Sequence, residues 1–375
     1  MLRRCLGAAV VLLACGAGAA LAESTASPAD ARPAFEPFAD FRLREENNFG
    51  DRDGRSNERT QLRLRGGARY ALSNSLTVGA RITMLESSRL IGVSDTASTL
   101  ADSTDFRIDY AYLRFKQDDL TVFAGRFPNP FFRTELQVVW DNEFNPQGAA
   151  ATYQLIHAVR ARPGLDVTAL YYPLQYDWIG RESTLTGMQW VLKQASGGSR
   201  YRLGIGYFDY ELHGEPNVEH EDYVRGNVVV PGLGFVSDFK LLDVIGDVML
   251  EPWGEKWPVQ IVTNYVHNRG ATTGEDAAYA VDAYVGHLEH SGNWRLNYAY
   301  ARVEADAVFV AFSQDNTSIA SNYRWHSLGV EYALGKQVTL SGIWYRYRPD
   351  DARYAGRNQA DDWLNRVRFE VNVTF

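Results

Sequence analysis

Residues 363–375 read Trp-Leu-Asn-Arg-Val-Arg-Phe-Glu-Val-Asn-Val-Thr-Phe. From Val367 to Phe375 every second residue is apolar or aromatic, and the residues between them are charged or polar. Alternation with a period of two is typical of a β-strand that has one apolar face and one polar face. The stretch therefore predicts an amphipathic strand that finishes on an aromatic side chain.

The same alternation recurs along the chain in about sixteen segments, and tight turns and longer breaks follow one another in strict alternation. The segments are 38–47, 58–72, 75–87, 104–116, 120–127, 150–161, 164–174, 185–194, 199–210, 237–251, 258–268, 277–289, 293–303, 324–334, 337–348 and 363–375. Short turns at one rim and long loops at the other are what an up-and-down barrel requires. We therefore expect an all-β, antiparallel up-and-down barrel of about sixteen strands.

The apolar faces of these segments predict a barrel that spans a membrane. The chain contains 21 Tyr, 18 Phe and 9 Trp, and many of them lie near the ends of segments, as in the aromatic girdles of membrane barrels. Beyond the N-terminal segment there is no apolar run of about eighteen residues. Without a helix, only a closed barrel satisfies every backbone group in lipid. A soluble sandwich, propeller or β-helix is the alternative, and no sequence repeat supports the last two.

The N-terminal segment has the features of a secretory signal peptide. Residues 1–22 combine a positive start, an apolar body and a small-residue cleavage site at Ala20-Leu21-Ala22. An uncleaved anchor and a lipoprotein lipidated at Cys15 are the alternatives. We expect a flexible leader at 23–34 and a transmembrane barrel over 35–375, with short turns in the periplasm and long loops outside the cell.

Composition excludes several classes of function. The formal net charge is −8, which disfavours nucleic-acid binding. Both cysteines lie in the expected signal peptide, so the exported chain has no disulfide, no thiolate metal site and no cysteine nucleophile. His213 and His220 are spaced unlike any standard metal site. No metal or cofactor is expected, and an outer-membrane lipase- or protease-type enzyme, or a plugged adhesin or receptor barrel, is the alternative to a channel.

The break at 128–148 is the third long one, and it differs from an ordinary loop. It is rich in aromatic and charged residues, and Pro128 and Pro130 end the strand before it. Long irregular connections of this kind are often functional. We expect this loop to fold into the barrel and to constrict a pore with four charged side chains: Arg133, Glu135, Asp141 and Glu143.

If apolar side chains face lipid, the arginines that alternate with them face the pore. The residues expected in this basic wall are Arg42, Arg44, Arg63, Arg65, Arg69, Arg81, Arg107 and Arg126. A charge on the lipid face would be costly, which favours the inward assignment. Alternatively, each arginine pairs with a nearby acid and serves only to hold the wall together. Acids expected to face inward on later strands are Asp166, Asp243, Asp247 and Glu331.

Charges on opposite sides of a water-filled gap would set the ion preference. The arginines favour anions, whereas the loop acids and the net charge favour cations, so the preference stays open. Arg114 and His157 fall on the expected lipid face, either near a rim or because a β-bulge shifts the alternation.

The stretches Phe-Ala-Gly-Arg-Phe-Pro-Asn-Pro-Phe-Phe at 123–132 and Val-Trp-Asp-Asn-Glu-Phe-Asn-Pro-Gln-Gly at 139–148 resemble the signature region of the bacterial putative-porin family. The strand that ends at Phe375 also resembles the recognition signal of outer-membrane barrels, read by the barrel-assembly machinery. The resemblance implies a barrel in the outer membrane of a Gram-negative bacterium, in contact with lipid and lipopolysaccharide. It also implies passive diffusion of small hydrophilic solutes or ions, and a homotrimer by analogy with other porins.

Overall fold

The computed structural model describes residues 34–50, 57–90, 104–159, 162–174, 182–213, 226–230, 234–355 and 359–375. The expected signal peptide and most of the expected leader lie outside these residues. Phe35–Phe375 form one compact unit.

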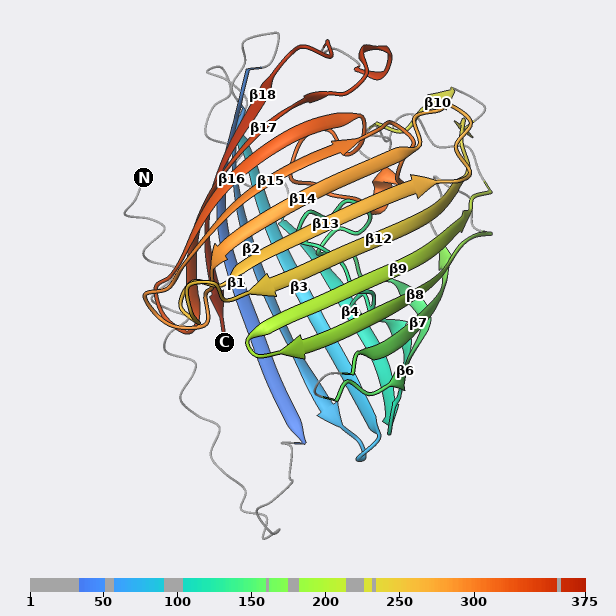
Figure 1. Cartoon of the computed structure of the whole chain (residues 1–375), viewed down its shortest axis with the longest axis vertical. Helices are drawn as coiled ribbons and strands as arrows, with labels where there is room; N and C mark the ends of the chain where they lie inside the picture. The colour runs from blue at the N-terminus through green and yellow to red at the C-terminus, as the bar shows by residue number, and fades with distance from the viewer. Residues whose placement is uncertain are drawn as a thin grey trace. The chain divides into compact units, whose positions relative to one another are not determined.

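Sixteen strands close into one barrel, and each strand pairs antiparallel with its neighbours (Figure 1). They are β1 (Phe35–Phe49), β2 (Asn57–Ala71), β3 (Leu76–Leu90), β4 (Thr104–Gln117), β5 (Leu120–Arg126), β6 (Gln147–Ile156), β7 (Gly164–Leu174), β8 (Ser183–Ser196), β9 (Ser199–Glu211), β12 (Phe239–Leu250), β13 (Val259–Asn268), β14 (Ala277–Gly286), β15 (Trp294–Val303), β16 (Tyr323–Ala333), β17 (Val338–Pro349) and β18 (Leu364–Thr374). β1 pairs with both β2 and β18, which closes the barrel. The predicted up-and-down barrel of about sixteen strands is confirmed.

The connections alternate in length as predicted. Two residues separate β4 from β5 and β8 from β9, whereas 127–146 and 304–322 are long connections at the opposite rim. The long connection between β9 and β12 carries a small hairpin that the sequence did not predict, formed by β10 (Val229–Val230) and β11 (Gly234–Phe235). Two short 3₁₀ helices complete the described structure, η2 (Val310–Phe312) and η3 (Ala352–Tyr354).

Side chains alternate between an apolar outer face and a mixed inner face. On β9, Tyr201, Leu203 and Ile205 are exposed on the outside, whereas Phe208 and Tyr210 are buried inside. A continuous band of exposed apolar side chains is what a lipid-facing barrel presents. Among the described residues, no helix is both long enough and apolar enough to cross a membrane.

A β-bulge on β4 corrects one part of the predicted alternation. The β3–β4 register shifts between Arg81 and Ile82, so Asp109 is an extra residue on β4. Tyr110 and Tyr112, which simple alternation with the predicted wall residue Arg107 would place on the lipid face, are therefore turned inward and are only 3% and 7% exposed.

The bulge also accounts for Arg114, because the alternation beyond it places this residue on the inner face. Its Nη2 atom donates to Thr77 Oγ1 at 3.3 Å. The inward turn of Tyr112 requires Gly79, since a Cβ atom there would lie 2.4 Å from the tyrosine ring. His157 lies beyond the end of β6, in the short connection to β7, where its Nε2 is 3.0 Å from Asp119 Oδ1.

Candidate functional site

The connection between β5 and β6 is seated against the inner wall at β8 and β9. The side-chain amide of Gln189 accepts from Phe132 N at 2.7 Å and donates to Phe132 O at 2.8 Å. The Phe132 ring packs against Gly204, where a Cβ atom would lie 2.9 Å from it. Arg202 lies over the same ring, with 4.5 Å between the guanidinium carbon and the ring centroid. Glycine inside β9 thus permits close packing of the loop.

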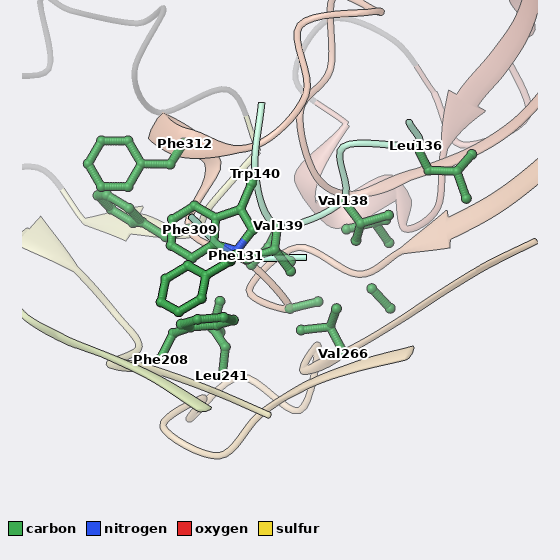
Figure 2. Close-up of a cluster of buried hydrophobic side chains, with 14 of the residues drawn as sticks. Phe131, Leu136, Val138, Val139, Trp140, Phe208, Leu241, Val266, Phe309 and Phe312 are labelled. Atoms are coloured by element: carbon green, nitrogen blue, oxygen red, sulfur yellow. The ribbon is translucent and has the colours of Figure 1, made fainter. Parts of the chain in front are cut away.

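The apolar side of the loop forms one cluster with the inner wall (Figure 2). Trp140 is 1% exposed and packs on both Phe131 and Phe208, at centroid distances of 5.9 and 4.9 Å. Val138 and Val139 are 2% and 4% exposed in the same cluster. Burial of this many apolar groups fixes the loop in one position, because each contributes about 1.5–3 kcal/mol.

Glu135 projects from the loop toward β14 and β15. Its two carboxylate oxygens accept from both terminal nitrogens of Arg295, each at 3.1 Å. Tyr284 donates to the same carboxylate at 3.4 Å. A bidentate arginine–carboxylate pair fixes orientation as well as distance, so the loop has a defined charged contact with this wall.

Glu143 projects toward a different part of the wall, at β1 and β2. Its Oε1 atom accepts from Arg42 Nη1 on β1 at 3.0 Å and also from Arg63 Nη1 on β2. Burial opposes ionisation of the Glu143 carboxyl, but the charges of Arg63 and Arg42 outweigh it and lower its pKa. The side chain is still 41% exposed. Glu143 is thus an ionised group whose side chain is partly accessible to solvent.

Asp141 has a different electrostatic environment from Glu143. Burial, followed by the negative charge of Asp315, raises its pKa to about 7. Its backbone oxygen accepts from Arg133 Nη1 at 3.2 Å. Near neutral pH, Asp141 is therefore the loop carboxyl whose charge changes with pH.

The loop returns to the wall through the bulge on β4. Asn145 Nδ2 donates to Asp109 Oδ1 at 2.8 Å, and Arg81 donates to the other carboxylate oxygen at 2.5 Å. The bulge thus turns a carboxylate inward at the point where the loop joins β6. Arg114 on the expected lipid face was the sign of this bulge in the sequence, but it did not reveal that Asp109 contacts Asn145.

A second connection, 304–322, is also buried against these elements, and the sequence analysis did not single it out. Phe312, in η2, packs on Phe144 with a centroid distance of 4.4 Å, and its backbone oxygen accepts from Asp141 N at 2.7 Å. Figure 2 draws Phe309 and Phe312 in the same buried cluster as Trp140. Further along the segment, Asp315 is exposed and adds a third carboxylate beside Asp141 and Glu143.

Four of the arginines predicted for the basic wall lie on β1 and β2, and acids are interleaved with them. Arg44 pairs with Glu370, and Asp40 accepts from Arg63 at 3.2 Å and from Arg65 at 2.8 Å. Each of these arginines faces the inside of the barrel, so they line one charged strip of wall.

The remaining predicted wall residues lie in three settings. Arg69 pairs with Glu36 at 3.3 Å. Arg107 is exposed and lies opposite Thr83, a residue of the inner face. Arg126 pairs in register with Ala111. Ala111 alternates with the inward-facing Tyr110 and Tyr112, so the register places Arg126 on the outer face.

Sequence reasoning missed the arginines of β18. Arg368 pairs with Glu46 at 2.6 Å, and Arg366 donates to the backbone oxygen of Asn316 at 2.8 Å. Both side chains are less than a tenth exposed. They continue the basic strip of β1 and β2 across the strand that closes the barrel. Their alternation with Val367 and Phe369 was the signal that could have revealed them.

The acids predicted on later strands are inward and paired. Lys193 donates to Asp166, Asn264 donates to Asp243 at 2.6 Å, and Arg202 donates to Asp247 at 2.7 Å. Glu331 accepts from Arg295. These contacts hold neighbouring strands together.

One group of carboxylates has spacing compatible with a metal ion. Oxygens of Glu275, Glu304 and Asp350 lie within 4.8 Å of one another. Arginines already neutralise them, since Asp350 accepts from Arg302 at 2.9 Å and Glu275 accepts from Arg353 at 2.8 Å. The group is therefore an ion-pair network. Of the two histidines His213 and His220, His220 lies outside the described residues.

A sixteen-stranded barrel with a lipid-type outer face and a charged interior defines an outer-membrane porin. A family model described as "Putative porin" matches residues 39–214 and 233–349, and the chain belongs to this family. No curated protein sequence matches the chain.

The chain is also similar in fold to solved outer-membrane porins. Pseudomonas putida OprB, in its high-pH structure, has a TM-score of 0.61 at 13% identity, with 91% of this chain and 94% of that chain covered. Salmonella typhi OmpF, solved with daunomycin, has a TM-score of 0.53 at 9% identity over 91% and 97%. An anion-selective porin from Comamonas acidovorans has a TM-score of 0.51 at 13% identity over 91% and 99%. At these low identities the likeness shows a shared fold and nothing more.

Proposed function

We propose that the protein is a passive diffusion channel for small hydrophilic solutes and ions, constricted by loop 128–148 facing an arginine-rich wall. The wall consists of Arg42, Arg44, Arg63 and Arg65, continued by the arginines of β18. The loop supplies Arg133, Glu135, Asp141 and Glu143. Arg126 is left out because its register places it on the outer face.

The observation that carries this proposal is the pair of ionic contacts made by the loop. Glu135 contacts Arg295 on β15, whereas Glu143 contacts Arg42 on β1 and Arg63 on β2. Three strands, β18, β17 and β16, lie between these two sites along the wall. A loop that bonds to both sites narrows the water-filled path between them.

Opposed charges at such a narrow section would set ion preference through their local field. A unit charge about 8 Å from a passing ion in water changes its energy by roughly 0.5 kcal/mol, or about twofold in permeability. Because each carboxylate favours cations and disfavours anions, the effects on the ratio of anion to cation permeability compound, and even after salt screening the three loop carboxylates change this ratio by roughly fivefold to tenfold.

The family and the fold favour a channel over the enzymatic or plugged barrels that the sequence alone left open. We further propose that a signal peptide at 1–22 is cleaved, and that the strand ending at Phe375 is read by the barrel-assembly machinery. Contact with lipopolysaccharide and assembly as a homotrimer belong to the same proposal, by analogy with porins.

Planar-bilayer recording of the refolded, detergent-purified protein tests the proposal. We expect discrete, voltage-independent steps in KCl that scale with salt concentration. Heat-modifiable migration in gels serves as the control that the barrel is folded. Folded protein that inserts into the bilayer without any discrete conductance would overturn the proposal.

A further inference from the structure

Two neighbouring arginines in the wall share a single oxygen atom. Arg42 and Arg63 lie directly opposite each other in the β1–β2 register, and both face inward. Like charges in directly opposed positions of an antiparallel pair are destabilising. Both guanidinium groups donate to Oε1 of Glu143, which relieves this repulsion from outside the sheet.

Most of the carboxylates on the wall itself already pair with other arginines. Glu46 pairs with Arg368, and Glu370 pairs with Arg44. Asp40 divides its contacts between Arg63 and Arg65. None of these contacts supplies Arg42 with a carboxylate, so the positive charge at this point of the strip is balanced by the loop.

The two arginines also keep unused hydrogen-bonding capacity. Among the described residues, the Nε atoms of both Arg42 and Arg63 are buried without a hydrogen-bond partner. Each residue is less than a tenth exposed, at 9% and 8%. A planar guanidinium group is shaped to hold a carboxylate through two parallel bonds, and here two of them converge on one site.

Glu143 reaches this site on a loop and is itself accessible from the barrel interior. Its side chain is 41% exposed, and the next residue toward the N-terminus, Asn142, is exposed as well. A solute that enters the proposed pore can therefore approach the carboxylate and the two arginines together.

We propose that Arg42 and Arg63 form a binding site for the carboxylate group of small organic acids, and that Glu143 is a tethered occupant which such solutes displace. This inference rests on the proposed diffusion channel. A group held beside the site by a packed loop competes at an effective concentration of millimolar order or above. Competition of this strength keeps solute binding weak, which allows passage rather than trapping.

Succinate block of the KCl current through single channels tests the inference. In Glu143→Gln we expect the half-blocking concentration of succinate to fall about tenfold or more, because the tethered competitor is lost. Glu135→Gln is the matched control. It removes the same charge from the same loop but leaves Arg295 paired with Glu331, and we expect a fall of only about twofold, from the loss of one repulsive charge.

Two further measurements separate binding from general electrostatics. Succinamide, which is neutral and of similar size, should leave the current unchanged in all variants. Adding Arg63→Gln to Glu143→Gln should return the half-blocking concentration to the wild-type value or above, with gel migration showing a folded barrel.

An unchanged half-blocking concentration in Glu143→Gln, or an equal fall in Glu135→Gln, would overturn the inference while the channel itself stands. Absence of any KCl conductance in the folded wild type would instead overturn the proposed function.

Discussion

Loop 128–148 and segment 304–322 both pack inside the barrel and share one apolar cluster, but their polar contacts differ. The loop reaches the wall with the partly exposed carboxylates Glu135 and Glu143. The segment is held by buried polar groups: Asp306 is 0% exposed and accepts from Ser237 Oγ at 2.6 Å. The comparison suggests that the loop presents charge to solutes, whereas the segment keeps the loop in place.

The buried network of the segment ties together several connections at the long-loop rim. Asn227 Nδ2 donates to the backbone oxygens of Ala305 and Val308, both at 2.8 Å. Asn268 Nδ2 donates to Asp306 O at 2.7 Å. Satisfied buried polar networks of this kind favour one arrangement, because a half-satisfied network is costly.

The largest expected effect comes from removing the contact between the two regions. Phe312→Ala leaves a cavity beside Phe144 and should lower the free energy of unfolding by about 3–5 kcal/mol. Urea unfolding in detergent micelles measures the change. Phe49→Ala, at a residue 42% exposed, is the control, and an equal loss in both variants would contradict the packing argument.

Breaking the polar network should have a smaller effect. Asp306→Ala leaves the donors of Ser237 and Thr273 without their buried acceptor, and we expect a loss of about 1–3 kcal/mol. Asp306→Asn keeps one acceptor oxygen and should lose less. Limited proteolysis of the folded barrel provides a second measurement, and wild-type resistance in Asp306→Ala would show that the segment is held by other contacts.

A change of pH should alter the charge of the loop, and the expected effect is smaller than that of the two substitutions above. The pKa of Asp141, raised to about 7 by burial and then by Asp315, leaves this group neutral at pH 5.5 and ionised at pH 8.5. Ionisation adds a negative charge beside Glu143, so raising pH across this range should shift the reversal potential toward cation preference by about twofold in permeability ratio. Asp141→Asn should remove that part of the shift, and an unchanged pH profile would place Asp141 away from the ion path.

The raised pKa of Asp141 also determines whether the free energy of unfolding rises or falls with pH. The folded protein holds the Asp141 proton up to about pH 7, whereas the unfolded chain releases it near pH 3.8. The stability that this group contributes is therefore present at low pH and falls as the pH rises through that window. In urea unfolding, Asp141→Asn should flatten this part of the pH dependence.

The sequence was sufficient for the strand count, the closure and the alternation of connection lengths, because a period of two repeats in every strand. It was wrong about Tyr110 and Tyr112, since one inserted residue at Asp109 reverses the alternation without changing composition. It gave no sign of segment 304–322, whose partners, such as Asn227 and Ser237, lie about 70 to 80 residues away. The pore role of loop 128–148 stays a prediction.

The central claim is that the loop carboxylates and the arginine wall together set ion preference. The reversal potential across a bilayer in a KCl gradient tests this claim most directly. The variant that combines Glu135→Gln, Asp141→Asn and Glu143→Gln should shift toward anions by roughly fivefold to tenfold in permeability ratio at low salt. High salt should reduce the shift through screening. A reversal potential equal to that of the wild type, in a folded and conducting variant, would contradict the claim.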